Sequence, residues 1–341
     1  MSKVHRVLPT EFPRIVAWLE TIGAHRRILN TKFIGELAYE LERRHGDDDP
    51  TPVMWVDDAE QPHAAALLLE KYRFTVLETE HCSDASLRAI FSQTFDYALS
   101  EGHVLPGFIA LPPRANAALM SVVVERQLSD RYYERPSFLY FVEFEHATPR
   151  DQSDSSSLVE SFTLASGEQF VARPVTTDEV ELIYSLWPHR NESISQSSFA
   201  TYVQRFPSCC IEVVHDDHRR EPVAWAIVYS CGAIGALHVI DEYRRRGLAA
   251  RVLEYLLRHW HHARWQRPAT LEAHSRFAYA WALTSNTPSN QLFRTHSAVR
   301  WRFREAESGD EELMVYFTMP RDGRAVEVKQ GEQVDQRSPC C

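Results

Sequence analysis

The chain lacks the patterns that mark metal centres, disulfide frameworks and membrane spans. Only six of its 341 residues are cysteine, none of them form a CxxC pair, and no HExxH motif is present. These absences predict no bound metal and a reducing compartment. Cys340 and Cys341 leave lipidation of the chain end open, with an unmodified tail as the simpler interpretation. No apolar run is long enough to cross a bilayer, and the N-terminal segment lacks the apolar core of a signal peptide.

An excess of basic residues is also absent. The chain carries 37 Lys and Arg against 47 Asp and Glu, which gives a formal net charge of −10. This balance argues against a general affinity for nucleic acid or for an anionic membrane. The run Arg244, Arg245 and Arg246 stands out on such a background and indicates a discrete anionic ligand. It is accompanied neither by a GxGxxG turn nor by the Lys-Ser/Thr of a Walker loop.

Length and composition predict two domains. A chain of 341 residues exceeds the usual size of one domain, and 44% hydrophobic residues suffice for a core in each half. The serine-rich, polar stretch 146–161 is predicted to be a linker. It separates an N-terminal α/β domain at 1–145 from a C-terminal domain at 162–320. The charged segment 321–341 is predicted to be a disordered tail.

Hydrophobic periodicity predicts alternating strands and helices in both halves. In the first half we expect helical segments within 11–44 and around 114–130, and strands at 53–58, 74–79, 107–112 and 137–144. In the second half the predicted order is β-α-α-β-β-β-α-β-α-β. Its elements are expected at 170–187 (a strand and then a helix), 198–206, 208–215, 222–230, 234–240, 248–262, 277–286, 287–297 and 312–319.

The arginine run lies where a predicted strand passes directly into a predicted helix. The first turn of a helix has unpaired N–H groups and the positive end of the helix dipole, so it binds phosphate when the backbone is accessible. Gly247 has no Cβ, and the small residues Ala249 and Ala250 leave this turn uncrowded. The arginines would add charge-assisted hydrogen bonds. The alternative interpretation is a solvated basic turn that caps an ordinary amphipathic helix. The candidate phosphate-binding residues are Arg244, Arg245, Arg246, Gly247, Leu248, Ala249 and Ala250.

The segment RRRGLA fits the pattern Arg/Gln-x-x-Gly-x-Gly/Ala, which cradles the pyrophosphate of coenzyme A in N-acetyltransferases. The second half, over about 165–320, resembles the GNAT superfamily of CoA-dependent N-acyltransferases and, within it, the glycine N-acyltransferase-like family. The matching segments are RFPSCCIEV, PVAWAIVYSCGAIG, LHVIDEYRRRGLA and SNTPSNQLF. The first half, which ends in RPSFLYFVEF, resembles that family's N-terminal region more weakly. The fold implied is α/β (α+β): a GNAT domain with a mixed, splayed central sheet, preceded by a GNAT-like α/β domain.

The resemblance implies direct transfer of an acyl group from acyl-CoA, as co-substrate, to the amine of a small acceptor such as glycine. Backbone groups of Leu237, His238 and Val239 would pair with the pantetheine arm. Asn286 would contact the arm near its sulfur, and its alternative role is an ordinary helix N-cap. Only small-molecule partners are expected, with no nucleic acid. The compartment expected is intracellular, cytoplasmic or mitochondrial; the sequence leaves the oligomeric state undetermined.

The sequence departs from the family at two positions that would handle protons. The strand glutamate assigned as base corresponds to Ala233, and the tyrosine that protonates the thiolate corresponds to Phe293, which is kept here only as a cofactor-binding position. His238 is the candidate base, with a core histidine as the alternative. His274 beside Glu272 and a water chain also stay open. These departures keep two other functions open: a catalytically weak acyl-CoA-binding protein, and an acetyltransferase for another amine.

Several further side chains have simpler interpretations than catalysis. Cys209 and Cys210 have no histidine at useful local spacing, so they are expected to be core residues of a strand. Trp225, Tyr229 and Trp281 could line an acyl pocket, although aromatic residues on neighbouring strands more often form core.

Overall fold

The computed structural model describes 4–22, 30, 32–34, 36–37, 53–69, 73–100, 105–143, 158–187, 195–259, 277–296 and 314–320. The chain divides into two compact units. Of the described residues, the first unit comprises those up to 139 together with 314–320, and the second comprises those in 140–259 together with 277–296. The last strand of the chain therefore belongs to the first unit, whereas the sequence pattern counted it with the C-terminal domain.

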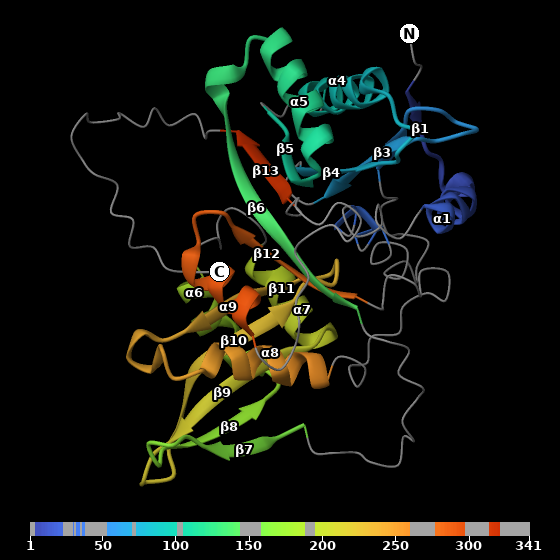
Figure 1. Ribbon diagram of the computed structural model, residues 1–341. Helices are drawn as coiled ribbons and strands as arrows, with labels where there is room; N and C mark the ends of the chain where they lie inside the picture. Colours follow the sequence, from blue (N-terminus) through green and yellow to red (C-terminus); the bar gives the residue numbers. More distant parts are fainter. Residues whose placement is uncertain are drawn as a thin grey trace, which may run out of the picture. The chain divides into compact units, whose positions relative to one another are not determined.

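The first unit contains a mixed sheet in the order β1-β2-β3-β4-β5-β13-β6 (Figure 1). Its neighbouring strands are antiparallel wherever their register is described, except β4 and β5, which are parallel. The strands are β1 (His5–Arg6), β2 (Met54–Val56), β3 (Ala64–Leu69), β4 (Arg73–Glu78), β5 (Gly107–Leu111), β13 (Met314–Pro320) and β6 (Tyr132–Glu143). The helices are α1 (Phe12–Thr21), α4 (Asp84–Ser100) and α5 (Pro113–Glu125), with 3-10 turns η1 (Pro9–Glu11) and η3 (Ser129–Arg131).

Two apolar cores enclose this sheet, one on each face. One core joins aromatic residues of the strands, such as Phe74 and Phe108, to α4 through Phe91 and Phe95 and to α5 through Leu119. The other packs α1 against the same strands, with Ile15 among its fully buried residues. Both faces of the central strands are therefore buried, as expected where helices cover a sheet on both sides.

The second unit contains a five-stranded antiparallel sheet in the order β11-β10-β9-β8-β7 (Figure 1). Its strands are β7 (Glu160–Thr163), β8 (Gln169–Arg173), β9 (Ser208–Val214), β10 (Arg220–Val228) and β11 (Ile234–Val239). The unit also holds the end of β6 and its neighbour β12 (Phe277–Leu283). Its helices are α6 (Val180–Leu186), α7 (Gln196–Arg205), α8 (Leu248–Arg258) and α9 (Thr287–Thr295), with 3-10 turns η4 (Thr177–Glu179) and η5 (Asp241–Tyr243).

The five-stranded sheet has helices on both faces, and two adjacent cysteines reveal them. The thiol of Cys210 lies 3.6 Å from Oε1 of Glu179, at the start of α6. Side chains alternate along a strand, so Cys209 points to the opposite face, and α8 packs against β9. Both cysteines are fully buried, which confirms that they are core residues of a strand. Burial raises the pKa of both thiols, so neither is a ready nucleophile.

Most predicted elements lie where the sequence pattern placed them. All ten elements predicted for the second half are present, with ends that differ by a few residues where both ends are described. The prediction missed β1, β3, α4 and β7, and β6 begins five residues earlier than expected, at Tyr132. β7 starts at Glu160, inside the predicted linker 146–161, whose 146–157 part lies outside the described residues. The predicted tail 321–341 is outside them too. Within the described ranges, none of the helices has the length and apolar character needed to cross a bilayer.

Candidate functional site

Strand β11 carries one more residue than its partner β10 over the same length. Gly235 lies opposite Ile227 and His238 lies opposite Trp225, so three steps on β11 match two on β10. The bulge contains Ala236, whose φ of +50° is rare for a residue with a Cβ. Backbone held in such a conformation clusters at functional sites. A bulge leaves its extra residue without a cross-strand partner, so the ladder with β10 is interrupted here.

Among the described residues, one backbone bridge links the β11 segment to β12. A parallel bridge joins Ala233 to Tyr279. Beyond it no further bridge joins the two strands in the described part of the chain, and they belong to different sheets. An extended ligand could therefore pair with the edge from Ile234 to Val239 as an added strand would. The splayed sheet predicted from the sequence corresponds to this separation.

β11 leads through η5 into the helix start that the sequence analysis selected. Gly247 is the N-cap of α8 and has a φ of +81°, a value that favours glycine. A Cβ built there would meet no atom within 4 Å, so its conformation rather than close packing requires glycine. Leu248 is buried, and the N-cap has no side chain that could accept from the first-turn N–H groups. Ala249 and Ala250 follow as small, partly exposed residues.

The first two arginines of this turn have different surroundings. Nη2 of Arg244 lies 2.7 Å from Oδ1 of Asp241, and its Nε donates to the carbonyl of Val239 at 3.1 Å. The backbone of Val239, predicted to pair with a pantetheine arm, is thus already held by Arg244. Arg245 is exposed, has a φ of +65°, and makes no hydrogen bond or ion pair with any residue that the structure describes. Arg245 is therefore the arginine most open to a ligand.

Arg246 is held on three sides. Its Nη1 donates to both carboxylate oxygens of Glu168, each at 2.6 Å, and its Nη2 donates to the carbonyl of Glu242 at 2.9 Å. The guanidinium carbon lies 4.9 Å from the centroid of the Tyr243 ring, a cation–π contact. Glu168 comes from the turn between β7 and β8, 78 positions away in the sequence, and the sequence analysis did not select it.

His238 stacks on an aromatic side chain of the next strand. Its ring centroid lies 4.9 Å from that of Trp225, with 24° between the ring planes. Trp225 is 1% exposed and belongs to the core, whereas His238 is half-buried. Burial lowers the pKa of His238 below 6.5, and the charge of Arg244 lowers it further. The imidazole is therefore neutral at neutral pH and able to accept a proton.

Tyr229 covers the backbone of Gly235, the residue before the bulge. A Cβ built at Gly235 would lie 2.5 Å from both Cζ and the hydroxyl oxygen of Tyr229. The Tyr229 ring is packed between Trp187 and Tyr202, with ring centroids 6.2 and 6.1 Å away. Side chains alternate between faces along β10, so Tyr229 and Trp225, and with it His238, share one face of the sheet.

The two positions that depart from the family's pattern are buried. Ala233 is fully buried, and its carbonyl accepts from the N–H of Tyr229 at 2.9 Å. The Phe293 ring is 4% exposed and stacks on Tyr140 at 4.8 Å between centroids. Asn286 is the N-cap of α9, since its side chain accepts from the N–H of Ser289 at 3.2 Å. The N-cap role of Asn286 is thus confirmed, while its predicted contact with a cofactor stays a prediction.

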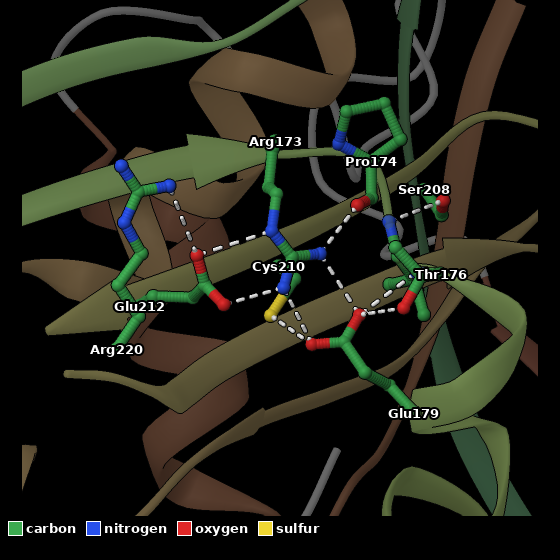
Figure 2. A network of polar contacts seen from close by, with 9 residues as sticks. Arg173, Pro174, Thr176, Glu179, Ser208, Cys210, Glu212 and Arg220 are labelled. Atoms are coloured by element: carbon green, nitrogen blue, oxygen red, sulfur yellow. Dashed lines mark hydrogen bonds and ion pairs between the residues drawn. The ribbon is translucent and has the colours of Figure 1, made fainter.

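A buried ionic network surrounds Arg173 (Figure 2). It lies on the same face of the sheet as His238, three strands away. Nε and Nη2 of Arg173 donate to the two oxygens of Glu212 at 3.1 and 2.5 Å. Its Nη1 and Nη2 donate to Glu179 at 2.9 and 2.7 Å. Glu179 also accepts from the N–H of Thr176 at 2.8 Å, which closes a capping box before α6. Cross-strand pairing then continues the row from Arg173 through Cys210 and Trp225 to His238.

The charges in this network compensate one another. Burial alone would raise the pKa of Glu179, but hydrogen bonds from Arg173 and Thr176 outweigh it, and the pKa lies below its ordinary value. The hydrogen bond to Glu179 raises the pKa of Arg173, so the guanidinium stays charged. The network fixes the start of α6 to the sheet; it contacts neither the bulge nor the arginine turn through any described hydrogen bond.

Some predicted features cannot be placed. Glu272 and His274, a second candidate for proton transfer, lie outside the described residues, as do Cys340 and Cys341. In the described ranges, no three His, Cys, Asp or Glu side chains form a group that could hold a metal ion.

Comparisons with known proteins give matches in structure alone. No family model matches the sequence, and no curated protein matches it. A solved Drosophila protein is similar over 94% of this chain and 99% of its own length, with a TM-score of 0.63 and 14% identity. A GCN5-related N-acetyltransferase from Sphaerobacter thermophilus is similar over 93% of this chain and 95% of its own, with a TM-score of 0.50 and 13% identity.

At such identities the likeness concerns the fold. The chain has a mixed α/β architecture that resembles GCN5-related N-acetyltransferase structures, and the predicted fold class is confirmed. The names of these two solved structures do not mention glycine N-acyltransferases, so that narrower resemblance stays a prediction.

Proposed function

We propose that the protein is an acyl-CoA-dependent N-acyltransferase that acylates the amine of a small acceptor. The observation that carries this proposal is the order of two features along the chain. The edge of β11, bulged at Ala236 and separated from β12, comes first, and Gly247, in a left-handed conformation at the start of α8, follows it. An extended arm and a diphosphate need these two features in this order. The fold shared with GCN5-related N-acetyltransferases supports it.

The residues of the turn fit a diphosphate chemically. First-turn N–H groups without a capping side chain accept an anion, and the space around Gly247 is open. Arg245 is exposed and supplies a positive charge next to that space. The candidate set stays Arg244 to Ala250 for the diphosphate, with the backbone of Leu237, His238 and Val239 for the arm. Asn286 and Phe293 are retained as further cofactor contacts on the resemblance alone.

His238 is proposed as the base. Acyl-CoA supplies an activated thioester; the amine must lose a proton as the new C–N bond forms and the C–S bond breaks. The imidazole is neutral at neutral pH. It lies two residues after Ala236 of the bulge, on the face of the sheet to which Tyr229 also points. An N–H at the bulge can stabilise the oxyanion. Glycine is the proposed acceptor, and this rests on the resemblance of the second half to glycine N-acyltransferases.

The burial of Ala233 and Phe293 favours a second candidate, an acyl-CoA-binding protein with weak or no turnover. Neither side chain can move a proton, and Phe293 stacks on Tyr140 instead of reaching solvent. This candidate predicts CoA binding without acyl transfer.

Binding and turnover are measured separately to decide between the candidates. A panel of acyl-CoAs is mixed with glycine and other amines, and free thiol is followed over time. Thiol release that depends on the amine supports the transferase, whereas CoA binding without release with any amine supports the binding protein. Arg246→Glu should weaken CoA binding through charge reversal. Unchanged affinity in that variant would contradict the placement of the diphosphate.

A further inference from the structure

The ion pair between Arg246 and Glu168 uses the donors that a phosphate would need. Nη1 donates to both oxygens of Glu168 and Nη2 donates to the carbonyl of Glu242. The ring of Tyr243 covers one face of the guanidinium. An anion can therefore bind Arg246 through Nη1 only by displacing or sharing the Glu168 carboxylate.

Glu168 is itself held in position for this pairing. It lies in the turn of the β7–β8 hairpin, where Gly167 has a φ of +90° and its N–H donates to the carbonyl of Leu164 at 2.9 Å. The hydroxyl of Ser166 donates to Oε2 of Glu168 at 2.8 Å. This hydrogen bond and that of Arg246 keep the pKa of Glu168 below its ordinary value, so the carboxylate is charged at neutral pH. The turn thus presents an anion to the arginine run.

We propose that Glu168 is a built-in competitor for the diphosphate site, and that it sets the affinity and selectivity of the site for anions. The proposal rests on the function proposed above. A carboxylate already neutralises Arg246, so a ligand must bring more charge than one carboxylate to displace it. A diphosphate does so, whereas simple monoanions do not. In the free protein the contact also orients Arg246 and weakens its binding of other anions.

The size of the effect follows from the exposure of the pair. The side chains of Arg246 and Glu168 are each 36% exposed, so solvent screens the pair and the competitor is weak. Removal of one competing charge from such a pair should strengthen CoA binding about two- to fivefold. A stronger competitor would close the site; a weak one discriminates without blocking it.

The experiment is a double-mutant cycle on CoA affinity, measured by titration calorimetry at low and at physiological salt. Glu168→Gln is combined with Arg246→Gln, and Glu221→Gln is the matched control. Glu221 is an exposed carboxylate of β10 that pairs with Arg219 at 3.2 Å, and its substitution changes the net charge equally. Inorganic pyrophosphate and acetate serve as probes of selectivity.

We expect Glu168→Gln to bind CoA more tightly in the native background and not in the Arg246→Gln background, with a gain that shrinks as salt rises. Glu221→Gln should show no comparable gain, and only Glu168→Gln should gain acetate binding. Equal or weaker CoA binding by Glu168→Gln would overturn the proposal, as would an equal gain in the Arg246→Gln background. If none of the proteins binds CoA, the proposed function fails instead, which is a distinct result.

Discussion

The hydroxyl end of Tyr229 lies against Gly235 so closely that no side chain fits between them. A Cβ at Gly235 would come within 2.5 Å of the Tyr229 hydroxyl oxygen. The ring has little freedom to withdraw, because Trp187 and Tyr202 pack beside it. Glycine at this position therefore serves a close approach, and the phenol is fixed beside the bulge of β11.

We predict that Gly235→Ala destabilises the fold by about 1–3 kcal/mol, the usual cost of overpacking. The measurement is urea unfolding, repeated in a Tyr229→Ala background. Removal of the ring should abolish most of the penalty, because the added methyl group then has room. An equal penalty in both backgrounds would show that the ring is not what restricts Gly235.

The ionic network of Figure 2 gives a second stability prediction. Arg173→Met leaves the carboxylates of Glu179 and Glu212, whose side chains are 12% and 8% exposed, without their common partner. We expect a loss of about 3–5 kcal/mol in the free energy of unfolding. Arg219→Met is the control: that side chain is 60% exposed, and its pair with Glu221 should contribute less than about 1 kcal/mol. Similar losses for both variants would contradict the assigned role of the network.

The acid limb of the rate profile tests His238. A base must be deprotonated, so kcat/KM should rise with pH through the pKa of His238, which burial and Arg244 hold below 6.5, and should be flat around neutral pH. Arg244→Gln removes one of the two causes and should move the limb to higher pH. His238→Asn should remove the limb and lower turnover with little effect on CoA affinity. A limb that persists in His238→Asn assigns the base elsewhere.

Arg245 should contribute to CoA affinity although it contacts no described residue. It is exposed, so its charge is available without loss of an existing ion pair. We expect Arg245→Gln to weaken CoA binding about three- to tenfold, measured by calorimetry at low salt. Arg219→Gln carries the same charge change in the turn between β9 and β10, outside the arginine turn, and should bind CoA as the native protein does.

The strand-turn-helix unit could be predicted because its determinants are local. An apolar strand, a glycine and an amphipathic helix follow one another within 25 residues, and the structure places β11, Gly247 and α8 accordingly. β3 was missed because its sequence, AAALLL, has no polar alternation. The structure gives the reason: Ala64 and Ala66 face one core of the first unit, while Ala65 and Leu67 face the other.

The remaining features depend on distant parts of the chain. The bulge at Ala236 is visible only in the register against β10, since alanine gives no sign of a positive φ. Glu168 meets Arg246 because the β7–β8 hairpin lies beside the helix start, and no local pattern relates the two residues. Gly235 offered a signal, a glycine inside a strand, which often marks a close approach.

The most direct measurement is a crystal structure of the protein with coenzyme A. We expect diphosphate oxygens within hydrogen-bond distance, about 2.7–3.2 Å, of the first-turn N–H groups of α8 and of the Arg245 guanidinium. Glu168 should have moved away from Nη1 of Arg246. A diphosphate bound elsewhere, with the contacts of Arg246 unchanged, would contradict both the site and the function proposed for it.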